Sequence, residues 1–321
     1  MTPGRLLFTG FMAGACIAFG FMLAVIAGCI AKLPPFVGPD GTFNKALLKI
    51  LLGAVFPVGL IMICIGGADL WTGNAQVVPY GRMTGKTDLK KVIYNWIGSY
   101  GGNFIGSVFL AFLAVFGTGL FLNNIFADTA IGIAKTKVSL GWWKAFWRGV
   151  GCNWLVNMAV WLYARSNDYA GKWLGIWFPI FAFVAIGFEH SIANMWVIPT
   201  AIFASNYAIT WTDFILNNLI PVTIGNAVGG FIFVALYYWW LCALKDGKVY
   251  GATLTDALRY IVEIQIIATL VLVALLNLVP LAIAYAIDVT AKNVAMWLTP
   301  TIISIYIVIL TFAFHRLAWS K

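Results

Sequence analysis

The chain has 321 residues, of which 62% are hydrophobic and only 10% are charged. A soluble domain carries about 25% charged residues, so this composition excludes a water-soluble fold. The formal net charge of +9 does not indicate nucleic-acid binding. Most Lys and Arg lie in short gaps between apolar runs, which is how membrane topology is specified.

The cysteines and the N-terminal run add no other chemistry. The five cysteines fall inside apolar runs without metal-ligand spacing, so neither a metal site nor a cofactor is predicted: Cys16, Cys29, Cys64, Cys152 and Cys242. The first apolar run, 5–30, is too long for the hydrophobic region of a signal peptide and has no convincing cleavage site. It is predicted to span the membrane.

Runs long enough to cross a bilayer, which takes ~20 apolar residues, follow one another along the chain. The predicted spans are 6–31, 46–65, 92–121, 145–164, 172–188, 215–243, 264–287 and 294–314. Two shorter pieces, 72–80 and 191–205, directly follow the second and fifth spans and are too short to cross alone. The predicted fold class is an all-α polytopic membrane protein.

Both short pieces follow similar interruptions. Residues 67–74 read GADLWTGN and residues 187–194 read GFEHSIAN, so each glycine precedes a carboxylate by two residues and an asparagine by seven. The next long span in each case carries the pattern N-x6-G-N-x2-G, which begins at Asn95 and at Asn218. Residues 1–120 and about 140–245 are therefore interpreted as two copies of a three-span unit.

An odd number of spans per copy gives the two copies opposite orientations in the membrane. Inverted repeats with broken helices are a transport architecture, in which the site lies at the breaks near the midplane. The alternative is that Gly and Asn merely permit tight helix packing. The recurrence of both acids and both short pieces in register favours transport. The basic flanks, among them Arg82, Lys86 and Arg165, predict that both termini are cytoplasmic. The expected location is the cytoplasmic membrane of a prokaryote.

His190 is the strongest single candidate for a functional residue. It stands at the second break, and an ionisable residue within the membrane is costly enough to suggest function. Histidine can also exchange protons near neutral pH. The structural alternative is a neutral imidazole that packs two helices. Thr72, in the first break, is predicted to offer a hydroxyl to a substrate beside His190, to cap the short helix, or to do both.

Further side chains are predicted to support the breaks: Asp69, Glu189, Asn74 and Asn194. For the two acids the favoured role is to accept backbone N–H groups, and a proton relay is the alternative. Asn153, inside the fourth span, either orients the imidazole or packs between helices. No H-E-x-x-H, G-x-S-x-G or P-loop motif is present, so no enzyme is predicted.

Bulky apolar residues surround these polar ones in the sequence and would form a dry constriction that rejects hydrated ions. They are Phe56, Leu60, Leu70, Trp71 and Phe183. The alternative is that they are simply core residues.

With GADLWT at 67–72, GFEHSIANM at 187–195 and NLIPVTIGN at 218–226, the chain resembles the formate/nitrite transporter family from about Arg5 to Leu244. The last segment resembles formate-type members most closely. The resemblance implies an aquaporin-like fold and a homopentamer with one pore per subunit. It also implies that the first break is a mobile loop that carries Thr72.

The same resemblance implies roles for individual residues. His190 would be the central histidine and Asn153 its partner. Lys137 would stand in the outer vestibule and Arg5 at the inner mouth, where positive charge concentrates anions. The cytoplasmic-side slit would be formed by Phe56, Leu60 and Trp71, and the periplasmic-side slit by Leu70 and Phe183.

The predicted function is a channel or transporter for a small monovalent anion, formate first, with protonation assisted by the central histidine. Nitrite or hydrosulfide is the alternative substrate, because side chains hardly separate small anions of this kind. A membrane-complex subunit that has lost transport is the alternative in class. Residues 1–249 would form the six-span core. Residues 250–321 have no family counterpart and are predicted to form a two-span hairpin on the lipid-facing side.

Overall fold

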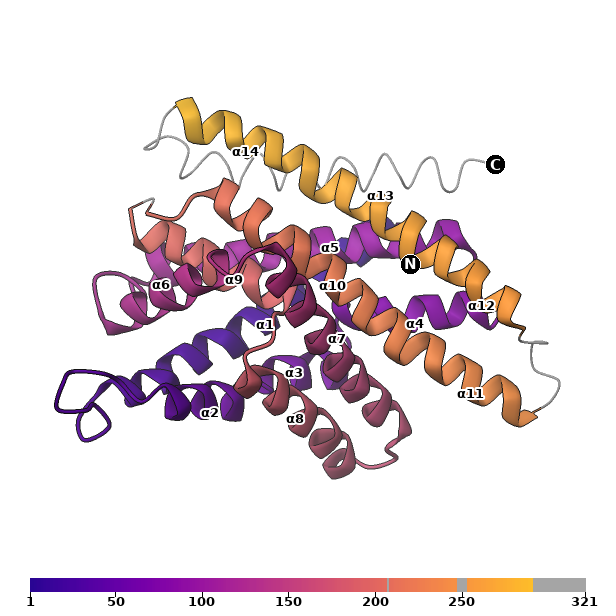
Figure 1. Ribbon diagram of the computed structural model, residues 1–321, viewed down its shortest axis with the longest axis horizontal. Coiled ribbons are helices and arrows are strands. Elements are labelled where there is room, and N and C mark those ends of the chain that lie inside the picture. Colours follow the sequence, from indigo (N-terminus) through magenta and orange to yellow (C-terminus); the bar gives the residue numbers. More distant parts are fainter. Residues whose placement is uncertain (207, 247–252, 291–321) are drawn as a thin grey trace.

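The computed structural model describes residues 1–206, 208–246 and 253–290, and most of them are helical (Figure 1). Within these ranges the only β-type pairing is an isolated bridge between Val37 and Phe43. Six helical segments of the described chain are long and apolar enough to cross a membrane: Pro3–Lys32, Lys45–Gly66, Leu89–Gly117, Tyr169–Ile186, Asp213–Cys242 and Leu254–Ile283. The all-α membrane class is confirmed. The predicted span 294–314 lies outside the described residues.

The first repeat runs from α1 to α5, with a break between α3 and α4. Its helices are α1 (Pro3–Gly28), α2 (Lys45–Val55), α3 (Val58–Gly66), α4 (Trp71–Met83) and α5 (Leu89–Phe112), and a π-helical turn, Leu113–Gly117, extends α5. The short apolar piece predicted at 72–80 is α4.

The second repeat runs from α7 to α11, with its break between α8 and α9. Its helices are α7 (Trp142–Arg165), α8 (Tyr169–Ile186), α9 (Ser191–Ala204), α10 (Ile220–Gly230) and α11 (Tyr237–Asp246). The π-helical segment Asp213–Leu219 directly precedes α10, and Phe231–Leu236 joins α10 to α11, so that 213–246 forms one rod. The piece predicted at 191–205 is α9. At 24 residues α7 coincides with the span predicted at 145–164, but it is less apolar than the six segments above.

The sequence did not predict α6 (Ile125–Val138), which lies between the repeats. Asn124 caps it by accepting the N–H groups of Phe126 and Ala127. With Asp128 in its first turn and lysines in its last, α6 interrupts the apolar pattern and is too short to cross a membrane.

Glycines let α5 approach α1, and α10 approach α7, at equivalent positions in the two repeats. A Cβ on Gly106 would collide with the backbone carbonyl of Phe11 in α1, and a Cβ on Gly229 with that of Val150 in α7. Close backbone contact at small residues is a common way to pack helices in membranes. The N-x6-G-N-x2-G pattern therefore has the same packing role in both repeats.

We expect Gly106→Ala to destabilise the protein by about 1–3 kcal/mol, because the added methyl group would meet backbone atoms that cannot rotate away. Gly132→Ala in α6 is the matched control, since open space surrounds that position. There the alanine is expected to raise stability slightly through its higher helix propensity. The melting temperatures of the two variants in detergent test this expectation. Equal shifts of the melting temperature in the same direction would contradict the close packing at Gly106.

A further helical rod follows the repeats. It consists of α12 (Leu254–Tyr260), α13 (Thr269–Val273) and α14 (Val279–Thr290), joined by π-helical segments at Ile261–Ala268 and Ala274–Leu278. We call this rod the appended helix. In Figure 1 it lies along α5 and α10, on the side of the core opposite α2 and α8.

Candidate functional site

Both breaks are built in the same way. Gly67 and Gly187 end α3 and α8 in the left-handed conformation, at φ of 83° and 94°, which a residue without Cβ adopts at little cost. The next helix begins two residues after each carboxylate, and the backbone N–H of its first residue is hydrogen-bonded to an asparagine. The Trp71 N–H donates to Asn103 Oδ1 and the Ser191 N–H to Asn226 Oδ1, both at 2.9 Å.

The side-chain amides of the same two asparagines also donate to backbone carbonyls. Asn103 Nδ2 donates to the carbonyls of Gly10 and Asp69, and Asn226 Nδ2 donates to those of Gly149 and Glu189. Each buried amide therefore ties its break to the neighbouring long helix. The repeat pattern contained these residues, but we did not predict them as site residues. Their recurrence in register was the signal that could have identified them.

The predicted role of the two acids was wrong. Asp69 accepts the side-chain amide of Asn74 at 2.6 Å rather than a backbone N–H. Glu189 accepts the amide of Asn194 at 2.8 Å and pairs with Lys137 Nζ at 2.9 Å. The backbone N–H groups that these carboxylates were expected to satisfy are already bonded to the asparagines of α5 and α10.

His190 and Thr72, from opposite repeats, meet. Thr72 Oγ1 lies 3.0 Å from His190 Nε2, and both side chains are buried. His190 is the N-cap of α9, with Nδ1 accepting the Ala193 N–H at 3.1 Å. Because Nδ1 is the acceptor, the neutral ring carries its proton on Nε2 and donates it to the threonine hydroxyl. The capping role considered for Thr72 is wrong, since Leu70 occupies the N-cap position of α4.

Asn153 supports Thr72 rather than the imidazole. Its Nδ2 donates to the Thr72 carbonyl at 3.1 Å and to the Asn226 carbonyl at 2.6 Å. Asn157, one helical turn later, donates to the same Thr72 carbonyl at 3.0 Å. The structure therefore favours the packing interpretation of Asn153, and it adds Asn157, which sequence reasoning missed.

The predicted constriction is only partly assembled as expected. The Phe183 ring stacks on His190 with a centroid separation of 5.8 Å, and Phe56 packs edge-to-face on Phe183 at 5.7 Å. These two phenylalanines therefore lie together, and their assignment to opposite slits was wrong. Which rings meet depends on the rotation of α2 and α8 about their axes. Leu60 and Leu70 are also buried.

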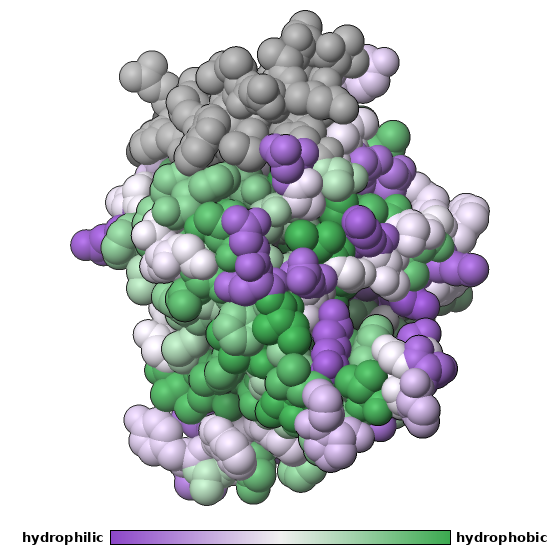
Figure 2. Space-filling view, turned by 90° about the vertical axis from the view of Figure 1, so that its left-hand side faces the viewer, coloured by the Kyte–Doolittle hydropathy of each residue, from purple (hydrophilic) through white to green (hydrophobic). Residues whose placement is uncertain are grey.

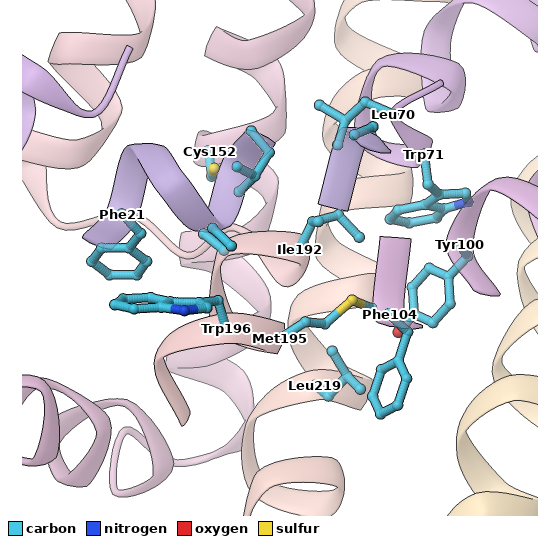
Figure 3. Packing of buried hydrophobic residues seen from close by; sticks show 14 of the residues in the cluster. Phe21, Leu70, Trp71, Tyr100, Phe104, Cys152, Ile192, Met195, Trp196 and Leu219 are labelled. Atoms are coloured by element: carbon cyan, nitrogen blue, oxygen red, sulfur yellow. The ribbon is translucent and has the colours of Figure 1, made fainter. Parts of the chain in front are cut away.

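Trp71 belongs to a different cluster. Its ring packs edge-to-face on Trp96 at 5.8 Å and on Tyr100 at 5.2 Å, both in α5, and Figure 3 shows Trp71 and Tyr100 side by side. We therefore reassign Trp71 from the slit to the packing of α4 on α5. In the second repeat the corresponding position is Ser191.

A cavity of about 360 Å³ leads to His190 between α2, α6, α7 and α8. Four basic side chains line it, against a single acid, Glu189: Lys45, Lys49, Lys137 and Arg148. Because Lys137 pairs with Glu189, the remaining charge comes from the other three. Figure 2 views the end of the molecule that carries α6, where hydrophilic residues are interspersed among hydrophobic ones.

The other vestibule candidate, Arg5, is exposed near the start of α1 and does not line this cavity. Within residues 1–206, 208–246 and 253–290, no three His, Cys, Asp or Glu side chains gather closely enough to hold a metal ion.

Comparisons with known proteins point to one family. A family model described as Formate/nitrite transporter matches residues 1–240. The chain is 46% identical over 252 residues to a "Probable formate transporter" of Methanothermobacter thermautotrophicus, covering 74% of this chain and 88% of that protein. It is 33% identical over 231 residues to the "Nitrite transporter NirC" of Escherichia coli, covering 71% and 80%.

A solved structure described as "Pentameric formate channel with formate bound" matches with a TM-score of 0.65 and 30% identity, covering 75% of this chain and 97% of that one. The matched share leaves out about a quarter of the chain, and the family model ends at residue 240, before the appended helix. With its apolar spans and paired helix breaks, the chain is an integral membrane protein and belongs to the formate/nitrite transporter family.

Proposed function

We propose that the protein carries small monovalent anions, formate first, through a pathway that passes between Thr72 and His190. The observation that carries this proposal is the buried hydrogen bond between these residues, at the end of a cavity whose charged lining is mainly basic. The names of the similar proteins, a formate transporter and a formate channel, support formate as the substrate.

The chemistry of the pair suits a carboxylate. A formate ion has two oxygens, and the Thr72 hydroxyl and the His190 Nε2–H are donors on opposite sides of the pathway. An anion that entered between them would exchange the bond between the two side chains for bonds to itself. Asn153 and Asn157 fix the Thr72 carbonyl and so keep the threonine in place.

Protonation would solve the energetic problem of the apolar passage. An unpaired ion loses its hydration among rings such as Phe56 and Phe183, which costs many kcal/mol. A proton from the aqueous side, passed through His190 to the anion, gives a neutral acid that avoids most of this cost. Formic acid is a much stronger acid than imidazolium, so the transfer is accessible only where desolvation penalises the separated ions.

Nitrite is the second candidate, because it is also a small planar anion and a nitrite transporter is among the similar proteins. Uptake by proteoliposomes of formate, nitrite, chloride and hydrosulfide tests the assignment. We expect formate to enter fastest, nitrite more slowly and chloride hardly at all, since chloride has no accessible conjugate acid. Chloride uptake at the formate rate would contradict the proposal. A protein that transports none of the four and co-purifies with a foreign chain would be a complex subunit.

For assembly we propose a homopentamer in the cytoplasmic membrane of a prokaryote, with both termini cytoplasmic and the appended helix facing lipid. The pentameric title of the similar formate channel supports the number of subunits. In the monomer only 17% of the α8 span is buried, which leaves a large apolar face for a neighbouring subunit or lipid. Native mass spectrometry is expected to show five copies, and a stable monomer or trimer would contradict this assembly.

A further inference from the structure

The appended helix makes polar contacts with the core at two places. One contact is with α4, the helix that carries Thr72, and the other reaches α4 through α5. The first contact is at the C-terminal end of α4. Glu263 Oε2 lies 3.0 Å from Arg82 Nη2, and the two side chains are 16% and 19% exposed. The Arg82 guanidinium also lies over the ring of Tyr260, with its Cζ 5.4 Å from the centroid.

A backbone contact closes the same end of α4. Trp239 Nε1 donates to the carbonyl of Met83, the last residue of α4, at 3.1 Å. The Trp239 ring in turn packs edge-to-face on Tyr260 at 5.5 Å. The C-terminal end of α4 is therefore held by an ion pair, a cation–π contact and a hydrogen bond, and the appended helix supplies Glu263 and Tyr260.

The second contact reaches the start of α4 through α5. Asn277 Oδ1 accepts the Tyr100 hydroxyl at 3.1 Å, and the same hydroxyl lies 3.0 Å from Thr223 Oγ1 in α10. The ring of Tyr100 packs on Trp71, the residue before Thr72, and Figure 3 shows this pair. Asn277, Tyr100 and Trp71 are completely buried, so a change at one is felt by the next.

The acids of the two breaks differ in their charge partners. Glu189, in the second break, pairs with Lys137, whose Nζ lies 2.9 Å from its Oε1. Asp69, the corresponding acid of the first break, forms no ion pair with any described residue. The two breaks thus share the asparagine supports but differ in charge pairing. The first break is held instead by hydrogen bonds, among them those from Asn153 and Asn157 to the Thr72 carbonyl, and by the packing and anchoring of α4.

We propose that Glu263 and Asn277 are positioning residues: they anchor the two ends of α4 and so keep Thr72 within hydrogen-bonding distance of His190. The consequence for transport rests on the proposed function, whereas the anchoring itself does not. The appended helix then contributes to the site without lining it. Removal of the appended helix would destabilise the first break more than the second.

Hydrogen–deuterium exchange on the full chain in lipid nanodiscs tests the anchoring directly. In Glu263→Gln and in Asn277→Leu, we expect residues 67–83 to exchange roughly tenfold faster than in the wild type, which corresponds to about 1.4 kcal/mol of lost local stability. Residues 187–204, which contain the second break, are the internal control and should keep the wild-type rate. Two independent variants guard against the failure of one of them to fold.

Arg259→Gln is the matched control variant. Arg259 Nε lies 2.7 Å from the other oxygen of Glu263, but it belongs to the appended helix itself. Its loss removes an ion pair from the same carboxylate without releasing α4, so exchange at 67–83 should stay at the wild-type rate. In the double variant Arg82→Gln with Glu263→Gln, exchange at 67–83 should be no faster than in the more severe single variant, since both substitutions break the same contact.

Transport gives the second measurement. The two anchor variants should lower the maximal formate uptake severalfold and flatten its pH profile, with little change in the half-saturating concentration. Unchanged exchange at 67–83 in both variants, or an equal rise at both breaks, would overturn the proposal. If exchange rises at the first break alone while the wild type carries neither formate nor nitrite, the anchoring stands and the proposed function fails.

Discussion

Replacing His190 with asparagine is expected to leave a folded protein whose formate uptake no longer rises as the external pH falls. An asparagine is a favourable N-cap, so its side-chain oxygen can accept the Ala193 N–H in place of Nδ1 and keep α9 intact. The remaining amide N–H groups can also donate to an anion. The asparagine cannot exchange a proton near neutral pH, however, so the route through a neutral acid is lost.

The measurement is the initial rate of formate uptake into proteoliposomes between pH 5 and 8. We expect a rate that is nearly independent of pH and at least about tenfold below the wild type at the acid end, if protonation contributes as a typical proton-transfer step does. His315→Asn applies the same chemical change to the other histidine of the chain and should leave the profile unchanged. A wild-type rate and profile for His190→Asn would make His190 a purely structural residue.

The second large effect is expected from Lys137→Met. Glu189 is buried, with its side chain only 4% exposed, and Lys137 Nζ lies 2.9 Å and 3.0 Å from its two oxygens. Removing the lysine leaves the carboxylate with amide donors alone, and breaking a buried ion pair in this way costs about 3–5 kcal/mol. The variant should therefore melt well below the wild type, or fail to accumulate.

Two further variants separate the charge from the packing. Lys135→Met removes an exposed lysine from the same helix and should leave the melting temperature nearly unchanged. Lys137→Met combined with Glu189→Gln removes both charges and should recover most of the lost stability, because no uncompensated ion remains. If the double variant is as unstable as Lys137→Met alone, the defect arises from lost packing rather than from the unpaired carboxylate.

The sequence by itself determined the class of the protein, the position of most helices and the existence of two breaks. Bilayer thickness sets the length of an apolar run, so spans can be counted without knowing how they pack. The in-register breaks also predicted that Thr72 and His190 would meet, because inverted repeats bring their interruptions to a common level. By contrast, α6 is short and polar enough to leave no such pattern.

Only the tertiary structure decided which partner each side chain has. Whether Phe56 lies beside Phe183, and whether Trp71 faces α5 or the pathway, depends on how each helix is rotated against its neighbours, which an apolar run of aromatics does not encode. Asn103 and Asn226 took the hydrogen bonds expected of Asp69 and Glu189 because the packing of α5 and α10 brings these two asparagines beside the breaks. The link from Glu263 to Arg82 joins positions 181 residues apart, and only the packed structure brings them into contact.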